Sequence, residues 1–239
     1  MKEIKIIVKR SDGEKVYTIP FSPKMHVLGS LFYIQENIEP DLAFRWNCGE
    51  GICGSCAAEV NGKPVLMCKT EITSVMETIK IDPLKVFPVV KDLVTDPSEI
   101  YSKLAKLKPY FTGEEKKDEF RKIHDKEIEE VQEMRKCINC FICYDSCHVI
   151  RNHPEVKFTG PMNVLKATSW DKHPDEKSER VPLLGEEGIW NCNVSRCCTN
   201  NCPQKIRITD DALIPAKERI ISEAGLFKSV AKRIREGKW

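Results

Sequence analysis

Four closely spaced cysteines mark the middle of the chain. The run CINCFICYDSC places Cys137, Cys140, Cys143 and Cys147 in the spacing C-x2-C-x2-C-x3-C. Thiolate is the ligand that iron prefers in iron-sulfur clusters, and bacterial-type ferredoxins use this spacing for cubane clusters, with the fourth cysteine ligating a neighbouring cluster. The run therefore predicts one-electron redox chemistry, with one ligand of the first cluster supplied from elsewhere in the chain.

A second cysteine run follows later and is incomplete. The run CNVSRCCTNNCP has Cys192, Cys198 and Cys202 in the register of the same motif. Ser195 occupies the position where another cysteine would complete it, and an additional Cys197 lies two residues further on. The two runs together predict two sites that exchange one cysteine.

The spacing assigns ligands to these two sites. We expect one 4Fe-4S cluster on Cys137, Cys140, Cys143 and Cys202. The other site has three thiolates, from Cys147, Cys192 and Cys198. Three thiolates suit a 3Fe-4S cluster, whereas a second 4Fe-4S cluster would need Cys197 or Ser195 to reach the fourth iron.

A different cysteine pattern lies near the N-terminus. In FRWNCGEGICGSCAAEVNGKPVLMC, the cysteines at 48, 53 and 56 are spaced C-x4-C-x2-C, and another follows at 68. This is the plant-type pattern for a 2Fe-2S cluster, so we expect the ligands to be Cys48, Cys53, Cys56 and Cys68. Gly49, Gly51 and Gly54 suit a tightly wrapped loop, because glycine tolerates positive φ and close approach of the backbone to a cluster.

Composition restricts the other function classes. The 239 residues include 12 cysteines, 38 basic and 36 acidic residues, so the net charge of +2 gives no indication of nucleic-acid binding. No apolar stretch is long enough to cross a bilayer, and no signal peptide is evident. A disulfide framework and a zinc-stabilised binding module remain alternatives, but clustered C-x2-C spacing disfavours the first and three interleaved cysteines in one run disfavour the second.

The elements around the first cysteine group predict a small α+β domain. Residues 2–9 and 15–19 alternate in polarity around Ser11-Asp12-Gly13, which indicates a β-hairpin. A helix is expected where Val27, Leu28, Leu31, Ile34 and Ile38 fall at helical spacing. Residues 57–60 and 64–67 predict a strand pair, and residues 77–81 a closing strand.

The rest of the chain predicts a helical domain. The segment from Pro88 to Phe111 indicates a connector with one helix, with a domain boundary near residue 95. A charged helix is expected over 114–135 with an apolar stripe of Phe120, Ile123, Ile128, Val131 and Met134. Residues 161–169 should be helical, residues 173–188 a polar excursion, and Pro215 should open a last helix that ends in a basic tail. We thus predict domains at 1–95 and 96–239.

The chain resembles the iron-sulfur subunit of succinate dehydrogenase and fumarate reductase over nearly its whole length. The stretches that carry the resemblance are FRWNCGEGICGSC, NGKPVLMC, PVVKDLVTD, CINCFICYDSC, KFTGP and the ending C-x5-C-x3-CP. The resemblance implies a β-grasp 2Fe-2S ferredoxin domain followed by an α-helical ferredoxin domain, and it implies the same eleven cysteine ligands.

The resemblance also implies the partners. The family's flavoprotein subunit carries FAD and interconverts succinate and fumarate, and the iron-sulfur subunit transfers electrons between that flavin and a membrane-anchored quinone site. We expect no substrate chemistry on this chain, because no base, nucleophile or carboxylate clamp is evident. A cytoplasmic position on the inner face of the cell membrane, held by partner subunits, follows from the resemblance.

Three positions depart from the better-known family members. His148 stands where proline is frequent, Asn152 lies near the position of a tryptophan that approaches the quinone, and Asn193 replaces a histidine. All three are expected around the third cluster, which disfavours an ordinary quinone pocket there. The alternative is the same relay module serving a thiol-dependent fumarate reductase or another dehydrogenase, with a cysteine-rich partner in place of the usual membrane anchor.

Overall fold

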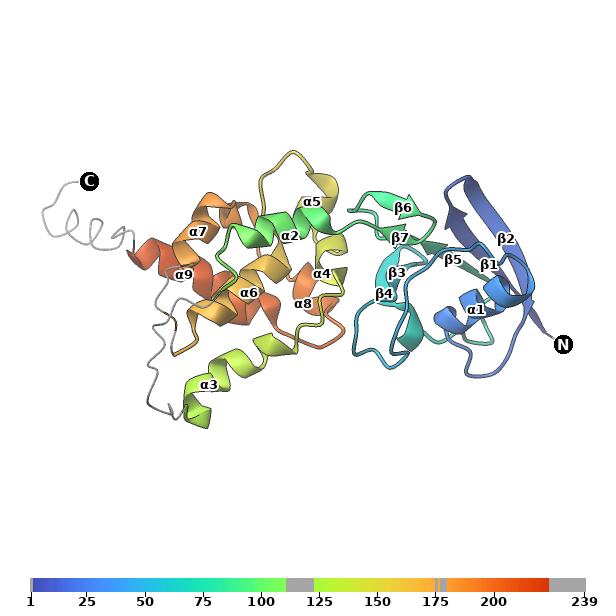
Figure 1. Ribbon diagram of the computed structural model, residues 1–239, viewed down its shortest axis with the longest axis horizontal. Coiled ribbons are helices and arrows are strands. Elements are labelled where there is room, and N and C mark those ends of the chain that lie inside the picture. The colour runs from blue at the N-terminus through green and yellow to red at the C-terminus, as the bar shows by residue number, and fades with distance from the viewer. Residues whose placement is uncertain (1, 111–122, 175, 177–179, 224–239) are drawn as a thin grey trace, which may run out of the picture.

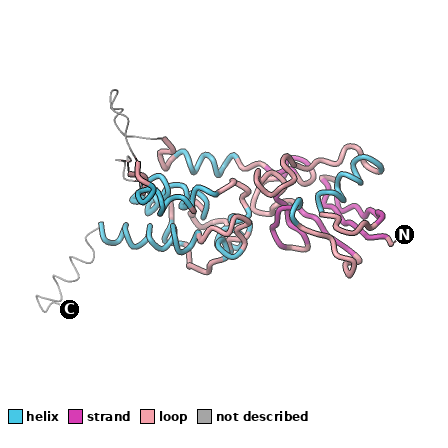
Figure 2. Tube along the Cα trace, turned by 90° about the horizontal axis from the view of Figure 1, so that it is seen from below, coloured by secondary structure: helices cyan, strands magenta, loops and turns pink. Residues whose placement is uncertain are grey.

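The computed structural model describes residues 2–110, 123–174, 176 and 180–223. Figure 1 shows two units side by side along the long axis, a strand-rich unit that contains the N-terminus and a helical unit that contains the later elements. In the view from below, the long strands all lie in the first unit (Figure 2). This arrangement confirms the predicted α+β class.

A five-stranded mixed sheet forms the first unit. Its strands are β1 (Glu3–Arg10), β2 (Gly13–Pro20), β3 (Ala57–Val60), β4 (Lys63–Leu66) and β5 (Thr78–Asp82), in the order β2-β1-β5-β3-β4. The β1–β5 pair is parallel and the other pairs are antiparallel. Helix α1 (Val27–Asn37) packs on the sheet, and a 3-10 turn, η1 (Met67–Lys69), follows β4.

The predicted hairpin and first helix are confirmed by their burial patterns. Ile4, Ile6 and Val8 point into the core, as strict alternation along a half-buried strand requires. On α1, four of the five predicted apolar positions are buried. Ile38 differs, because it lies beyond the last helical residue and its side chain is 46% exposed.

A short hairpin replaces part of the predicted connector. Strands β6 (Val89–Lys91) and β7 (Val94–Thr95) pair with each other, and α2 (Ser98–Ala105) follows them. The prediction missed this hairpin because two- and three-residue strands are too short to show alternation.

Short helices build the second unit. After α2 these are α3 (Asp125–Gln132), η2 (Met134–Lys136), α4 (Ile142–Asp145), α5 (His148–Asn152), α6 (Pro161–Asp171), α7 (Val181–Glu186), η3 (Ile189–Asn191) and α8 (Cys197–Asn200). A π-helical turn, η4 (Thr209–Leu213), then leads directly into α9 (Ile214–Glu223). The predicted helix at 161–169 is confirmed, and the last helix is present up to Glu223, but it begins at Ile214 and continues from η4 rather than opening at Pro215.

Two helical predictions need correction. The helix expected over 114–135 is described only from Asp125, and Phe120 lies outside the described residues. Ile123 is 41% exposed, so it does not belong to the buried stripe that Val131 and Met134 continue. The expected polar excursion contains α7, because Val181 and Leu184 pack into the core of the helical unit. The predicted basic tail lies outside the described residues.

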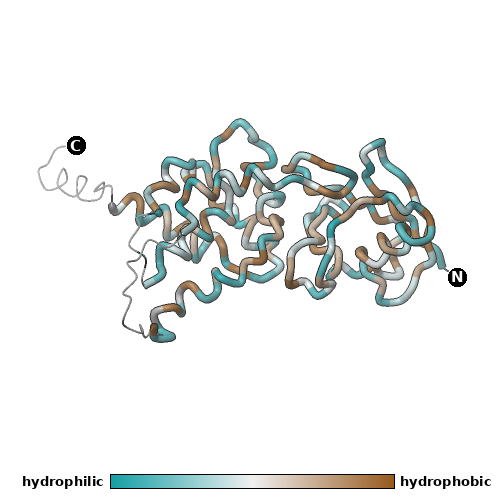
Figure 3. The backbone as a smooth tube through the Cα atoms, viewed as in Figure 1, coloured by the Kyte–Doolittle hydropathy of each residue, from teal (hydrophilic) through white to brown (hydrophobic). Residues whose placement is uncertain are grey.

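The two units have separate apolar cores. Along the tube in Figure 3, apolar and polar segments alternate in both halves, as expected where each unit buries its own set of side chains. Within the described parts of the chain, no helix has the length and apolar character needed to cross a membrane.

Candidate iron-sulfur sites

The first cysteine group lies on a loop between α1 and β3. Gly49, Gly51 and Gly54 have φ values of +70°, +74° and +76°, which confirms the expectation that glycine is needed in this wrapped loop. Cys68 lies on η1, directly after β4, and the Met67 amide donates to the Cys56 carbonyl at 3.1 Å. The β3–β4 hairpin therefore brings Cys68 back beside the loop.

Backbone amides of this loop point at the cysteine sulfurs. The amides of Glu50, Ile52 and Cys53 lie 3.3, 3.4 and 3.3 Å from the Cys48 Sγ. These donors lower the pKa of the Cys48 thiol to about 6 because they stabilise the thiolate, and the Glu50 amide has the largest effect. A loop that offers amides to sulfur fits a 2Fe-2S cluster, whose sulfides accept the same kind of hydrogen bond.

The second cysteine group lines a single pocket. Cys137, Cys140, Cys143 and the distant Cys202 all line it, together with apolar side chains that include Met162 and Leu165. Sequence spacing had predicted that Cys202 joins the first three, and the structure brings these four side chains together. Cys143 lies on the four-residue helix α4, Cys137 directly follows η2, and Cys140 and Cys202 lie outside the helices.

Burial makes this pocket unsuitable for free thiolates. Burial is the main cause that raises the pKa of Cys140 to about 12, and it raises the pKa of the fully buried Cys143 well above its usual value. A thiolate in such a pocket needs a compensating cation. Four cysteines in an apolar pocket therefore fit a cubane cluster, whose irons supply that charge.

The third group contains Cys147, Cys192 and Cys198. Cys147 precedes α5, Cys192 follows η3, and Cys198 lies on α8. Burial first, and then the neighbouring charges of Cys192 and Cys198, raise the pKa of Cys147. Cys147 and Cys198 are buried in the apolar core of the helical unit, and Cys192 packs against that core.

The two cysteine runs share one backbone conformation. In the first run Asn139 and Phe141 are left-handed, with φ of +55° and +62°, and in the second run Val194 and Arg196 have φ of +59° and +61°. Each run then enters a four-residue helix, α4 or α8. This repetition aligns Ser195 with Cys140 and aligns Cys197 with Ile142, which points into the core of the strand-rich unit.

Cys197 consequently lies beside the third group. It is the first residue of α8, and its Sγ lies 3.3 Å from the Ser195 Oγ. Cys198 is buried, and its Sγ lies 3.5 Å from the Thr209 Oγ1. Of the two fourth-ligand candidates, Ser195 holds the backbone position that corresponds to a predicted ligand.

The departures from the family pattern meet at this third group. The Asn193 Nδ2 lies 3.1 Å from the His148 Nδ1, and each residue directly follows a cysteine of the group. The His148 ring also contacts the His153 ring edge-on, with centroids 5.9 Å apart. Asn152 ends α5, the helix that His148 begins.

Charged residues join the two units, and sequence reasoning missed them. Glu59 on β3 is fully buried and forms ion pairs of 2.6 Å with Arg151 and with Lys85. Arg151 also contacts Asp145 at 3.3 Å, and the Val86 amide donates to Asp145 at 3.3 Å. The only sequence signal was a glutamate inside an otherwise apolar strand, which does not identify its partners.

Fold and sites together define a two-unit iron-sulfur electron carrier, with a ferredoxin-like sheet unit and a helical two-site unit. The family model for a 2Fe-2S iron-sulfur cluster binding domain matches residues 6–102, and the model for a 4Fe-4S dicluster domain matches residues 133–206. The chain belongs to the iron-sulfur subunit family of succinate dehydrogenases and fumarate reductases, as an electron-transfer subunit of that type of complex.

Individual relatives cover most of the chain. It is 33% identical over 226 residues to the fumarate reductase iron-sulfur subunit of Haemophilus influenzae, covering 86% of this chain and 88% of that one. One chain of the fumarate reductase (CoM/CoB) of Methanothermobacter marburgensis is 33% identical over 197 residues, covering 82% of this chain and 39% of that one. A chain of the Mycobacterium smegmatis Sdh1 complex in the apo form has 40% identity and a TM-score of 0.86, covering 92% of this chain and 96% of that one.

Proposed function

We propose that the chain relays single electrons between the FAD of a flavoprotein subunit and a membrane quinone site. The observation that carries this proposal is the contiguity of the three cysteine groups. Cys202 of the second run lines the pocket of the first run, and we assign Cys147 of the first run to the second group by the same spacing. The 2Fe-2S loop in turn touches the 4Fe-4S segments, since Gln204 donates to the Gly51 carbonyl. Three contiguous sites suit a relay.

The proposed ligands are the eleven cysteines predicted from spacing. When bound, the clusters supply reversible one-electron transfer, which divides the two-electron chemistry of a flavin into single steps. The residues of this chain hold each cluster, bury Cys143, Cys147 and Cys198 in the apolar core of the helical unit, and direct amides toward sulfur at Cys48. Hydrogen bonding and burial of this kind tune cluster potentials.

The surface around the 2Fe-2S loop suits a protein partner. Cys48 is exposed, and the neighbouring Trp46 and Ile52 are 52% and 68% exposed. Exposed apolar side chains next to a redox site favour burial against another subunit. We propose that the flavoprotein subunit docks here, and that a membrane anchor on the side of the third site holds the complex at the inner face of the cell membrane.

For the third site we propose a 3Fe-4S cluster on Cys147, Cys192 and Cys198. The shared backbone conformation of the two runs supports Ser195 as the side chain facing the missing corner. Cys197 corresponds to Ile142, which is not a proposed ligand, so we place it outside the ligand set.

A thiol-dependent fumarate reductase is the second candidate. Similarity to a chain of a fumarate reductase named for CoM and CoB supports it, as do His148 and Asn193, the two departures from the better-known family pattern, which form a polar contact with each other. In this candidate a cysteine-rich partner chain replaces the membrane anchor and quinone. The subunits that copurify with the chain distinguish the two candidates.

The test is the iron and sulfide content of the anaerobically purified chain, with low-temperature EPR during stepwise reduction. We expect about nine irons per chain and a paramagnetic oxidised cluster, as one 2Fe-2S, one 4Fe-4S and one 3Fe-4S cluster require. About ten irons with an EPR-silent oxidised protein would mean two cubanes and would contradict the 3Fe-4S assignment. Zinc without iron would refute the relay.

A further inference from the structure

The 2Fe-2S loop and the 4Fe-4S run touch through backbone atoms at one glycine. A Cβ built at Gly54 would lie 2.7 Å from the Ile138 carbonyl oxygen and 3.0 Å from both the Cα and the Cβ of Cys140. Ile138 precedes Cys140 in the first run, and Gly54 directly follows Cys53. Gly54, which directly follows the proposed 2Fe-2S ligand Cys53, therefore lies closely against the proposed 4Fe-4S ligand Cys140.

A second contact joins the same loop to the other 4Fe-4S segment. Gln204 follows Cys202-Pro203, and its Nε2 donates to the Gly51 carbonyl oxygen at 3.0 Å. Both chain segments that line the 4Fe-4S pocket thus reach the 2Fe-2S loop, at positions three residues apart. In Figure 1, α4 and α8 face β3 and β4 across this junction.

Side-chain packing keeps the first run against the strand-rich unit. Ile142 is buried in the core of that unit, and Ile138 packs against the same core. Directly beside the glycine contact, however, a cavity of about 390 Å³ separates the two segments, lined by Cys53, Ser55 and Asn139 among others. The close approach at Gly54 is therefore bordered both by this cavity and by the packing of Ile138 and Ile142.

We propose that Gly54 and Gln204 are positioning residues for electron transfer between the first two clusters. The inference rests on the proposed relay. One electron leaves the reduced 2Fe-2S cluster and enters the oxidised 4Fe-4S cluster, or moves in the opposite direction during fumarate reduction, and no bond is made or broken. The rate of electron tunnelling falls exponentially with the distance between the two clusters. Because Gly54 has no side chain, Cys53 and Cys140 can lie close together, and the transfer between their clusters is faster.

The test compares two glycine variants in the full chain with its clusters bound. Gly54 and Gly62 share φ of +76°, but a Cβ at Gly62 meets nothing within 4 Å. Gly54→Ala and Gly62→Ala therefore both place a side chain at the same positive φ, and only the first pushes the two cluster segments apart. Gln204→Leu removes the second contact without changing any glycine.

Pulse radiolysis follows electron transfer between the two clusters, and EPR of the fully reduced protein reports their spin–spin interaction. We expect Gly54→Ala to slow the transfer severalfold and to weaken the spin interaction, with Gln204→Leu acting in the same direction and Gly62→Ala matching the wild type. Iron content and midpoint potentials should stay unchanged in all three variants.

Equal rates and equal spin interaction in Gly54→Ala and Gly62→Ala would overturn the proposal. If Gly54→Ala loses its clusters, Gln204→Leu decides, and a wild-type rate there would also overturn it. Failure of the relay itself is distinguishable, because zinc without iron in the wild-type chain would refute the relay before any variant is compared.

Discussion

At the scale of single residues, the third site depends on which side chain faces its open corner. Left-handed residues at 194 and 196 repeat those at 139 and 141, so Ser195 takes the backbone position of Cys140. Cys197 takes the position of Ile142 instead. Cys197 and Cys198 are adjacent in sequence, but we expect only Cys198 to be a cluster ligand.

Ser195→Cys should convert the third site to a 4Fe-4S cluster, because it adds a thiolate at the position that holds a ligand in the first run. The iron content should rise by about one per chain, and the EPR signal of the oxidised protein should disappear. Cys197→Ser is the matched control, for which we expect an unchanged signal. An EPR-silent oxidised wild type, with a 3Fe-4S signal appearing only in Cys197→Ser, would instead identify Cys197 as the fourth ligand.

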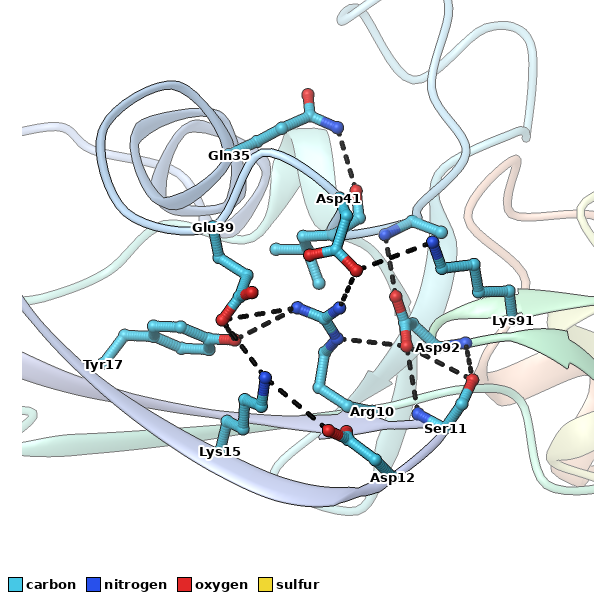
Figure 4. A network of polar contacts seen from close by, with 12 residues as sticks. Arg10, Ser11, Asp12, Lys15, Tyr17, Gln35, Glu39, Asp41, Lys91 and Asp92 are labelled. Carbon is cyan, nitrogen blue, oxygen red and sulfur yellow. Dashed lines mark hydrogen bonds and ion pairs between the residues drawn. The ribbon is translucent and has the colours of Figure 1, made fainter.

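At the scale of elements, a buried ionic network positions the approach to the 2Fe-2S loop. Arg10 at the end of β1 forms an ion pair of 3.0 Å with Asp92 in the turn between β6 and β7 (Figure 4). Asp92 also accepts hydrogen bonds from the amides of Ser11 and Ala43. The network therefore holds the β1–β2 hairpin, the β6–β7 hairpin and the segment that leads toward Cys48 in one arrangement.

Asp92→Asn should destabilise the strand-rich unit by about 2 kcal/mol, because it removes the buried carboxylate that pairs with Arg10 at 3.0 Å and leaves Arg10 with Asp41 at 2.9 Å and Glu39 at 3.8 Å. Burial alone would raise the pKa of Asp92, but the amides of Ala43 and Ser11 and the Arg10 charge outweigh it and lower the pKa. The stabilisation is thus present above the unfolded pKa of about 3.9 and is lost as pH falls through the lower native pKa.

Urea unfolding of the anaerobic protein at neutral and acidic pH measures this effect. The difference in the free energy of unfolding between the wild type and Asp92→Asn should become smaller as the solution is acidified. Lys91→Ala is the control, because Lys91 is half exposed and contacts Asp41 only at 3.7 Å, so its removal should cost less than about 1 kcal/mol. A difference in the free energy of unfolding that does not change with pH would contradict the assigned role of the Asp92 charge.

At the scale of the whole molecule, the two units are joined by an ionic cluster to which both of them contribute residues. Glu59 comes from the sheet, whereas Asp145 and Arg151 come from the helical unit, and both carboxylates are fully buried. Buried carboxylates are tolerated only when they are paired, so Arg151 holds the two units in register.

Arg151→Met should therefore cost about 3 kcal/mol of stability, since it leaves Glu59 and Asp145 without a shared cation. Hydrogen exchange should increase at the Val86 amide, which donates to Asp145. Arg207→Met is the matched control, because Arg207 is 71% exposed and pairs with Asp211 on the same segment. Equal stability and exchange in the two variants would show that the interface cluster does not hold the units together.

Sequence alone determined the class of protein and the grouping of its cysteines. Most ligands of each cluster lie close together in one run, so their spacing is a local property that is readable without a fold, and the spacing of the two runs also predicts that they exchange Cys147 and Cys202. The positive φ of Gly49, Gly51 and Gly54 was likewise predictable from the tight loop they occupy. The boundary near residue 95 stays a prediction.

Only the tertiary structure decided how these local pieces meet. The β6–β7 hairpin, α7, and the contacts of Glu59 and Gln204 depend on partners far away in sequence, and such partners leave no local periodicity. Gly54 shows the difference most directly. Its backbone conformation followed from the sequence, but the close contact with Cys140 exists only because a separate unit folds against it.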